Sequence, residues 1–181
     1  YLLIFQSIST FAERPDRVKK HLEDFPSKRH LVYKFSIKED IMPAATRLTQ
    51  KAIEEATELK ADFILLHLNT YGGAVDAADS IRTKLMQSKI PVIVFIDNNA
   101  ASAGALISIS CDRIYMRQGS NIGAATVVNQ TGEVVPDKFQ SYMRSMMRST
   151  AEAKGRDPQI AQAMVDPEVE IEGIIEKGKV L

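Results

Sequence analysis

The chain has little of what metal, redox and disulfide sites require. Cys111 is the only cysteine among 181 residues, tryptophan is absent, and the three histidines, at positions 21, 30 and 67, show no close metal-ligand spacing. A single cysteine excludes an intrachain disulfide and a thiolate-bound metal cluster. We therefore expect neither a metal nor a cofactor.

The sequence also lacks an excess of charge and a long apolar run. Lysine and arginine total 23, and aspartate and glutamate also total 23, so the formal net charge is zero. Such a chain has no net field that favours nucleic acid, and we expect no nucleic-acid partner. No apolar run approaches the length of a membrane span, so a membrane anchor would have to lie outside this chain.

The two ends are expected to differ from the middle. Residues 1–12, YLLIFQSISTFA, are apolar, end in small residues and lack the positively charged start of a secretory signal. They fit a clipped signal peptide or a first strand, and the polar stretch that follows favours the signal. We assign 1–30 to a signal remnant with a polar lead-in. Residues 31–181 form one domain, which we expect to be truncated at its C-terminus because 172–181 begins a strand and stops.

Strand patterns alternate with helix patterns along this domain. The predicted strands are 31–37, 62–69, 90–97 and 113–116. The predicted helices are 41–59, 75–85 and 102–110. The order implies an α/β fold with parallel strands and right-handed crossovers. The near-continuous apolar run of 62–69 is typical of a strand covered on both faces.

A loop rich in glycine, asparagine and serine, 118–134, precedes a last predicted helix. Pro136 and Asp137 open this helix. Its expected apolar stripe consists of Phe139, Tyr142, Met143, Met146 and Met147. Because a methionine stripe usually packs in a core or an interface, we expect this helix to support assembly into a homodimer or a larger homo-oligomer.

Two strand-to-helix turns, TYGGA and NNAASAGA, are predicted at the carboxyl ends of neighbouring parallel strands, where sites form in open α/β sheets. In the first turn, Gly72 and Gly73 remove side chains where a backbone N–H group could meet a ligand closely. A plain tight turn would explain the same two glycines.

Ser102 begins a helix in the second turn and has only small neighbours: Ala100, Ala101, Ala103 and Gly104. Small neighbours let a substrate carbonyl approach the hydroxyl, and the free N–H groups of the first helical turn can stabilise an oxyanion. Ser102 is therefore a candidate nucleophile. An ordinary helix-capping serine is the alternative.

A serine nucleophile needs a base, and neither turn contains a histidine. Lys138 lies at the start of the last predicted helix, where the helix dipole and desolvation favour the neutral amine that a base requires. The alternative is an ordinary surface lysine.

Five motifs occur together in the order TYGGAVDAA, SKIPVIVFI, NNAASAGALI, SNIGAA and AMVDP. From about Val32 to the end, the chain resembles the membrane-associated, ClpP-class serine proteases of the NfeD (nodulation efficiency D) family. The resemblance implies a ClpP/crotonase-like fold of repeated β-β-α units, with a largely parallel sheet flanked by helices. It also implies a protease domain on the extracytoplasmic side of a membrane.

The resemblance assigns a role to several residues. Ser102 matches the family's nucleophile and Lys138 its lysine base. The N–H groups of Gly73 and Ala103 match the oxyanion hole. The residues expected to border the substrate are Gly72, Tyr71, Ala101 and Gly104. Family members commonly have proline where Tyr71 stands.

The expected activity is a serine endopeptidase with a Ser-Lys dyad that cuts hydrophobic segments, with a polypeptide such as a stomatin-like membrane protein as its partner. Two alternatives remain on the same fold. One is a crotonase-type enzyme acting on acyl-CoA thioesters, which would leave Ser102 without a purpose. The other is an inactive scaffold or oligomerisation module.

Overall fold

The structure is a computed structural model that describes residues 17–24, 29–129, 131–172, 175–176 and 179–180. Residues 1–12, interpreted above as a signal remnant, lie outside the described residues. Within the described part of the chain, no helix combines the length and the apolar character needed to cross a membrane.

A parallel sheet forms the centre of the domain. Its strands are β1 (Val32–Ile37), β2 (Phe63–Thr70), β3 (Val92–Ala101), β4 (Arg113–Met116) and β5 (Asn121–Gly123). The strand order is β1-β2-β3-β4, and β5 pairs with a later part of β3. All of these pairings are parallel, which confirms the predicted α/β fold. Strand β5 was missed because it is three residues long and lies inside the polar loop.

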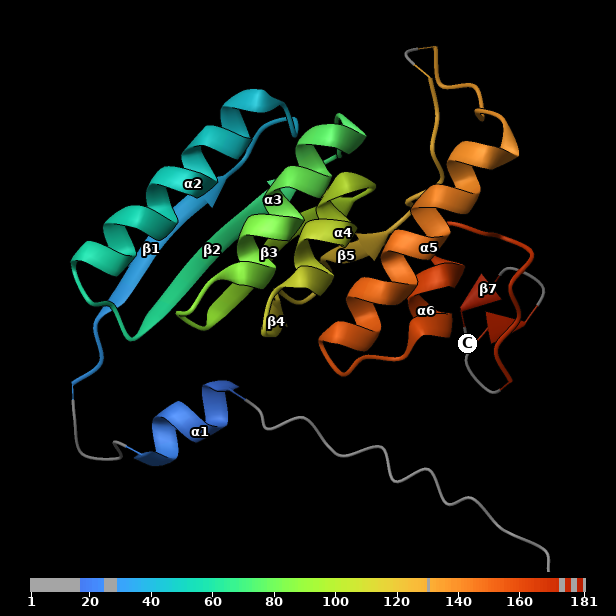
Figure 1. Ribbon diagram of the computed structural model, residues 1–181. Helices are drawn as coiled ribbons and strands as arrows, with labels where there is room; N and C mark the ends of the chain where they lie inside the picture. Colours follow the sequence, from blue (N-terminus) through green and yellow to red (C-terminus); the bar gives the residue numbers. More distant parts are fainter. Residues whose placement is uncertain (1–16, 25–28, 130, 173–174, 177–178, 181) are drawn as a thin grey trace, which may run out of the picture.

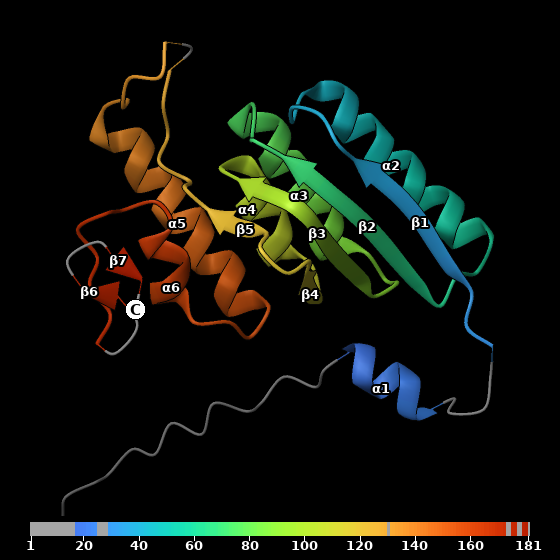
Figure 2. The ribbon, with the colours of Figure 1, turned by 180° about the vertical axis from the view of Figure 1, so that it is seen from behind.

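Three of the described helices connect strands and cover one face of the sheet, and three further helices lie outside this layer. The helices are α1 (Arg17–Asp24), α2 (Pro43–Glu58), α3 (Val75–Gln87), α4 (Ala103–Ser110), α5 (Asp137–Ala153) and α6 (Pro158–Ala163). In Figure 1, the connecting helices α2, α3 and α4 lie in front of the sheet, with α5 and α6 beyond them. Figure 2, seen from behind, shows the strands in front of these helices. A short hairpin of β6 (Ile175–Glu176) and β7 (Lys179–Val180) follows α6.

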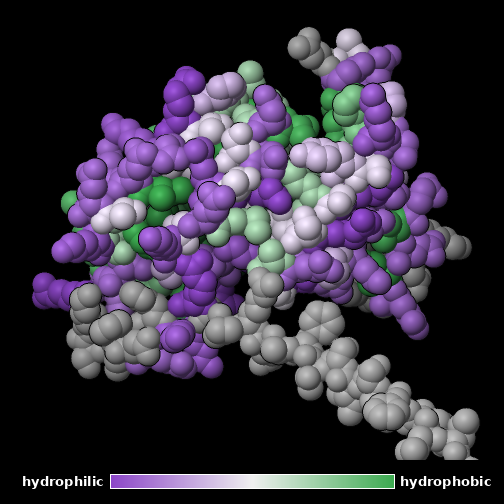
Figure 3. Space-filling model, in the orientation of Figure 1, coloured by the Kyte–Doolittle hydropathy of each residue, from purple (hydrophilic) through white to green (hydrophobic). Residues whose placement is uncertain are grey.

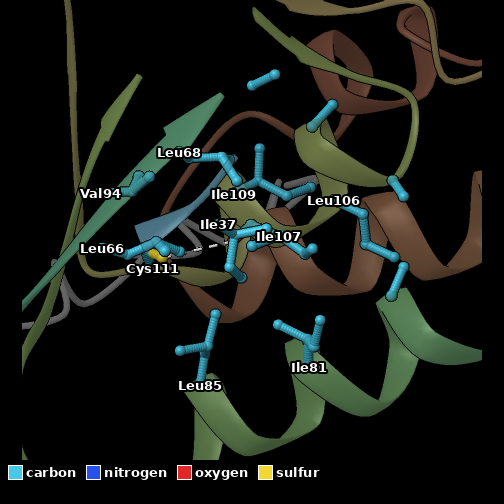
Figure 4. Packing of buried hydrophobic residues seen from close by; sticks show 14 of the residues in the cluster. Ile37, Leu66, Leu68, Ile81, Leu85, Val94, Leu106, Ile107, Ile109 and Cys111 are labelled. Carbon is cyan, nitrogen blue, oxygen red and sulfur yellow. Dashed lines mark hydrogen bonds between the residues drawn. The ribbon is translucent and has the colours of Figure 1, made fainter. Parts of the chain in front are cut away.

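The core lies between the sheet and the helices. In Figure 4, Leu66 and Leu68 of β2 and Ile81 of α3 point toward the same apolar region, which Leu106 and Ile107 of α4 also enter. All eight residues of α4, AGALISIS, are buried. The helix contacts β3 as well as α3 and α5, so it lies at the centre of the packing. At the end of α4, full burial raises the pKa of the Cys111 thiol to about 12, so this cysteine is a core residue.

The second face of the sheet is more open than the sequence predicts. Along β2 the side chains alternate: Ile64, Leu66 and Leu68 are buried, whereas Leu65 and His67 are only half-buried. The prediction that this strand is covered on both faces is therefore wrong for the described residues. His67 lies on the open face, where its Nε2 is 2.9 Å from Asp97 Oδ2. This hydrogen bond, together with nearby Arg117, lowers the pKa of Asp97.

The predicted apolar stripe of α5 is correct only for its later part. Met143, Met146 and Met147 are buried, but Phe139 is 48% exposed and Tyr142 is 56% exposed. Residues 124–129 and 131–136, between β5 and α5, form a segment that projects from the body in Figure 1. The first turns of α5 follow this projecting segment and extend beyond the sheet. Figure 3 shows this side as largely hydrophilic, with hydrophobic surface next to the projecting segment. The start of α5 therefore leaves aromatic surface exposed.

One buried carboxylate joins the start of β3 to the end of α5. Asp112 Oδ2 accepts a hydrogen bond from the Val92 N–H at 2.7 Å, and Oδ1 accepts one from Lys154 Nζ at 3.0 Å. Arg17 also reaches Oδ1, at 3.4 Å, and so connects α1 to the same group. The side chains of Asp112 and Lys154 are 7% and 9% exposed. The pair therefore acts as a buried ion pair whose members depend on each other.

We predict that Asp112→Ala will lower the free energy of unfolding by about 3–5 kcal/mol, because it leaves the Lys154 ammonium buried without its partner. Chemical denaturation measures the change. The matched control is Asp137→Ala. It removes an ion pair to Arg144, but the Asp137 side chain is 82% exposed. The control should change stability by no more than about 1 kcal/mol. Equal losses in the two variants would contradict the role given to Asp112.

Candidate active site

The two predicted turns lie against each other at the carboxyl ends of β2 and β3. Thr70 of β2 pairs with Ala100 of β3, so the residues that follow leave the sheet side by side. A Cβ atom built on Gly72 would lie 2.7 Å from Ser102 Cβ and 3.1 Å from its Oγ. The glycine at position 72 therefore leaves the space that the serine side chain occupies. The fold brings the glycine turn and the candidate nucleophile into direct contact.

Ser102 itself has an unusual backbone. Its φ and ψ are 52° and −117°, at the junction between β3 and α4. A residue with a side chain avoids positive φ unless its surroundings enforce it, and such strain is concentrated at functional sites. The Ser102 N–H donates to the Gly123 carbonyl at 2.8 Å, which fixes the junction to β5.

The Ser102 hydroxyl does not cap helix α4. Ser102 occupies the N-cap position, yet its side chain makes no capping hydrogen bond. The residue is half-buried. The capping role considered from the sequence is therefore not the role that the structure gives this serine.

The hydrogen bonds that hold the glycine turn do not use the Gly73 N–H group. Ile41 pairs with Gly73 in an isolated parallel bridge. Its hydrogen bonds run from Ile41 N–H to the Gly72 carbonyl at 2.7 Å and from Ala74 N–H to the Ile41 carbonyl at 2.8 Å. A Cβ atom on Gly73 would lie 2.3 Å from the Ile41 carbonyl oxygen, so only glycine fits. No described residue accepts a hydrogen bond from the Gly73 N–H.

The Ala103 N–H group is the second donor without an acceptor among the described residues. Ala103 is the first residue of α4, and the first hydrogen bond of this helix runs from Ala105 N–H to the Ser102 carbonyl at 2.9 Å. No acceptor for the Ala103 N–H occurs in the part of the chain that the structure describes. The first N–H groups of a helix commonly bind anions, because they have no partner within the helix.

Thr70 supports the glycine turn and was not identified from the sequence. Its hydroxyl donates to the Glu39 carbonyl at 2.8 Å and accepts the Gly72 N–H at 3.1 Å. Its methyl group packs against α4, because a Cβ atom on Gly104 would lie 2.7 Å from Thr70 Cγ2. Gly104 is buried, and its lack of a side chain lets α4 pack against β2. The only signal in the sequence was a threonine shortly before Gly-Gly.

Tyr71 and Ala101 directly precede Gly72 and Ser102, the two residues that lie against each other. Tyr71 precedes the two glycines and is 76% exposed, so its ring forms part of the surface beside the turn. Ala101, the last residue of β3, is half-buried, and its carbonyl lies 3.4 Å from the position of a Cβ atom on Gly72. Both residues are therefore near Ser102.

Lys138 lies on helix α5 and forms no hydrogen bond with Ser102 among the described residues. It is the second residue of α5 and is exposed, with Nζ 4.9 Å from the centre of the neighbouring Phe139 ring. No group of three or more histidine, cysteine or acidic side chains suited to a metal ion occurs within the described part of the chain.

Comparisons with known proteins identify relatives of this chain. The family model described as "NfeD1b, N-terminal domain" matches residues 31–181. Membrane protein NfeD1b of Bacillus subtilis is 32% identical over 144 residues, which are 80% of this chain and 33% of that protein. The membrane-bound protease PH1510 of Pyrococcus horikoshii is 30% identical over 151 residues, covering 79% of this chain and 34% of the relative. The chain thus spans about a third of the length of these two relatives.

Solved structures show the same architecture. The membrane-bound, stomatin-specific protease 1510-N, solved as a serine-to-alanine variant, superposes with a TM-score of 0.72 and 31% identity, covering 76% of this chain and 70% of that chain. A lysine-to-alanine variant of it, in complex with a substrate peptide, gives a TM-score of 0.71 at 31% identity, over 76% and 66% of the two chains. ClpP1 of Listeria monocytogenes shares the fold at 19% identity, with a TM-score of 0.61 over 82% of this chain and 84% of its own.

The match over the whole domain and the shared architecture lead to one conclusion: this chain belongs to the NfeD1b N-terminal domain family and has a ClpP-like fold.

Proposed function

We propose that this domain is a serine endopeptidase with Ser102 as its nucleophile. The observation that carries the proposal is the arrangement around this residue. A strained serine, whose hydroxyl does not cap its helix, is packed against the glycine turn. Gly73 of that turn and Ala103, the residue after the serine, each have a backbone N–H group with no acceptor among the described residues. These are the components that an acyl-transfer site requires.

In the proposed reaction, the Ser102 hydroxyl loses its proton to a base as its oxygen attacks a peptide carbonyl. The Gly73 and Ala103 N–H groups donate hydrogen bonds to the oxyanion that forms. Departure of the amine leaves an acyl-enzyme, which water then hydrolyses. The rigid connections of the turn to Ile41 and Thr70 keep one donor in place, and helix α4 holds the other.

Lys138 is the proposed base. A neutral lysine can take the serine proton, and solved structures of the 1510-N protease include one serine and one lysine variant, which supports a mechanism with both residue types. Because Lys138 is exposed and forms no hydrogen bond with Ser102 among the described residues, the mechanism requires the first turn of α5 to approach Ser102 when a peptide binds. The projecting segment before α5 is the part of the chain that would move (Figure 1).

The proposed substrate is an extended hydrophobic segment of a membrane-associated protein, and a stomatin-like protein is the proposed partner. The exposed apolar side chains support this choice, since Tyr71 lies beside the glycine turn and Val128 and Val134 lie on the projecting segment. An extended peptide could add as a strand next to the turn. The relative described as a stomatin-specific protease supports the same substrate class. We also propose that the domain lies on the extracytoplasmic side of its membrane.

Two other functions on this fold are distinguished by Ser102. A crotonase-type enzyme would turn over an acyl-CoA thioester with the same two N–H groups and would keep its full rate in Ser102→Ala. A scaffold would assemble normally, yet Ser102 would not react with any serine-directed reagent. The absence of a capping role for the Ser102 hydroxyl favours the peptidase over both.

We predict that the purified chain will cleave members of a panel of hydrophobic peptides and that Ser102→Ala will abolish cleavage, because the variant lacks the hydroxyl that forms the proposed acyl-enzyme. Mass spectrometry of the products measures this. A serine-directed fluorophosphonate should label Ser102 in the parent chain only. Cleavage that persists in the variant would contradict the assignment of the nucleophile.

We predict that Lys138→Ala will lower kcat by at least about a hundredfold, the usual scale for loss of a general base, with the fold intact. Steady-state cleavage of the best peptide from the panel measures this. Lys51→Ala is the matched control, because Lys51 is an exposed lysine on α2. An undiminished rate in Lys138→Ala would remove this lysine from the mechanism.

We also predict that the full-length protein forms at least a dimer through the exposed aromatic start of α5. Tyr142→Glu should shift the protein toward a monomer in sedimentation velocity, because burying a carboxylate in an apolar interface is unfavourable. Tyr115→Glu is the matched control, since Tyr115 on β4 is equally exposed, at 56%. A monomeric parent protein, or equal effects of the two substitutions, would contradict this interface.

A further inference from the structure

The pairing of β2 with β3 changes register just before the candidate active site. Leu68 pairs with Ile96, and the next pair along the two strands is Thr70 with Ala100. Between these pairs β2 advances by two residues and β3 advances by four. Strand β3 therefore contains a bulge with two extra residues, within the segment from Asp97 to Asn99. Bulges of this kind redirect the chain that follows them.

This bulge determines how far the chain reaches before it turns at Ser102. In a regular parallel pairing, Asn98 rather than Ala100 would lie opposite Thr70. Two residues of parallel strand span about 7 Å, so Ser102 would lie about 7 Å farther from its present place beside Gly72. The contact between the serine and the glycine turn therefore depends on the bulge.

Asparagine side chains hold the bulge from both neighbouring strands. The Asn99 N–H donates to Asn69 Oδ1 of β2 at 3.0 Å, which replaces the ladder hydrogen bond that the register change removes. On the other side, Asn121 Nδ2 of β5 donates to Asn99 Oδ1 at 2.6 Å. Asn99 is only 9% exposed, so its polar groups depend on these two partners.

The same strand pair continues directly to the serine. Asn99, Ala100 and Ala101 pair with residues 121–123 of β5, and the next hydrogen bond joins the Ser102 N–H to the Gly123 carbonyl at 2.8 Å. A change in the position of Asn99 is therefore transmitted over three residues to the strained backbone of Ser102. Strain of this kind persists only where the surrounding structure fixes it.

We propose that Asn69, Asn99 and Asn121 form an asparagine bracket that sets the bulge in β3 and so positions the Ser102 hydroxyl beside the Gly73 and Ala103 N–H groups. The proposal rests on the proposed nucleophilic role of Ser102. The three side chains are positioning residues, since they act on the reaction through the backbone of β3 and not by contact with the substrate.

Two substitutions at Asn69 separate its hydrogen bond from its size. Asn69→Leu keeps the branching at Cγ and the number of non-hydrogen atoms but removes the acceptor for the Asn99 N–H, whereas Asn69→Asp keeps an acceptor oxygen. We expect Asn69→Leu to slow fluorophosphonate labelling of Ser102 about tenfold, the factor that corresponds to one hydrogen bond of ordinary net strength. The Asp variant should retain most of the rate. In peptide cleavage, the loss should appear in kcat with KM little changed.

A matched control lies within the same bulge. Asn98 is exposed and its side chain forms no hydrogen bond with another described residue. Ser102 of the Asn98→Leu variant should therefore be labelled at close to the parent rate. Thermal unfolding of each variant establishes that it is folded. If Asn69→Leu does not fold, Asn121→Ala provides the test from the other side, because Asn121 is an exposed residue and we expect its truncation to leave the fold intact. It should also slow labelling.

The bracket is overturned if folded Asn69→Leu is labelled at the parent rate, or if Asn69→Asp is impaired as strongly as Asn69→Leu. Failure of the proposed function looks different, because the parent chain itself would then show no labelling at Ser102. Hydrogen exchange of the Asn99 amide, measured by NMR, tests the bracket without any activity. Exchange should be faster in Asn69→Leu than in Asn69→Asp, and equal exchange in both would also overturn the bracket.

Discussion

The parallel pairing of β2 with β3 is the constraint on which the rest of the site depends. Parallel strands end at the same edge of a sheet, so the turns that follow them must meet there. Here the glycine turn and Ser102 meet so closely that a single methyl group on Gly72 would collide with the serine. The neighbours of the two turns, Ile41 and Thr70, then fix the direction of the backbone N–H groups.

Helix α4 connects this local geometry to the stability of the domain. It follows the serine directly, is buried along its whole length, and leads into Cys111, next to the ion pair of Asp112 with Lys154. The strained end of the helix is thus attached to a body whose packing and charges do not easily rearrange. This arrangement is typical of active sites, where local strain is maintained by the surrounding fold. The base proposed for the reaction is different, since Lys138 lies on the exposed first turn of α5.

Much of the fold could be predicted because its signals are local. The buried strands β2 and β3 are apolar runs, α2 and α3 show helical spacing, and the small residues around Ser102 stand out in the sequence. The errors have physical causes. The apolar run of β2 resembles a strand buried on both faces, yet His67 within it pairs with Asp97 on an open face. The aromatic start of α5 has helical spacing, but the helix extends past the sheet that would cover it.

The sequence by itself determined the order of the four longer strands and of helices α2 to α5, the parallel α/β class and the identity of the two turns, because these follow from residue types and spacing within short segments. Tertiary structure alone decided that Gly72 touches Ser102, that the Gly73 and Ala103 N–H groups lack a described acceptor, and that Thr70 and the three asparagines hold the site. The reason is that each of these features joins residues that are distant in the chain. Their partners are chosen by strand register and packing, which no short segment of sequence specifies.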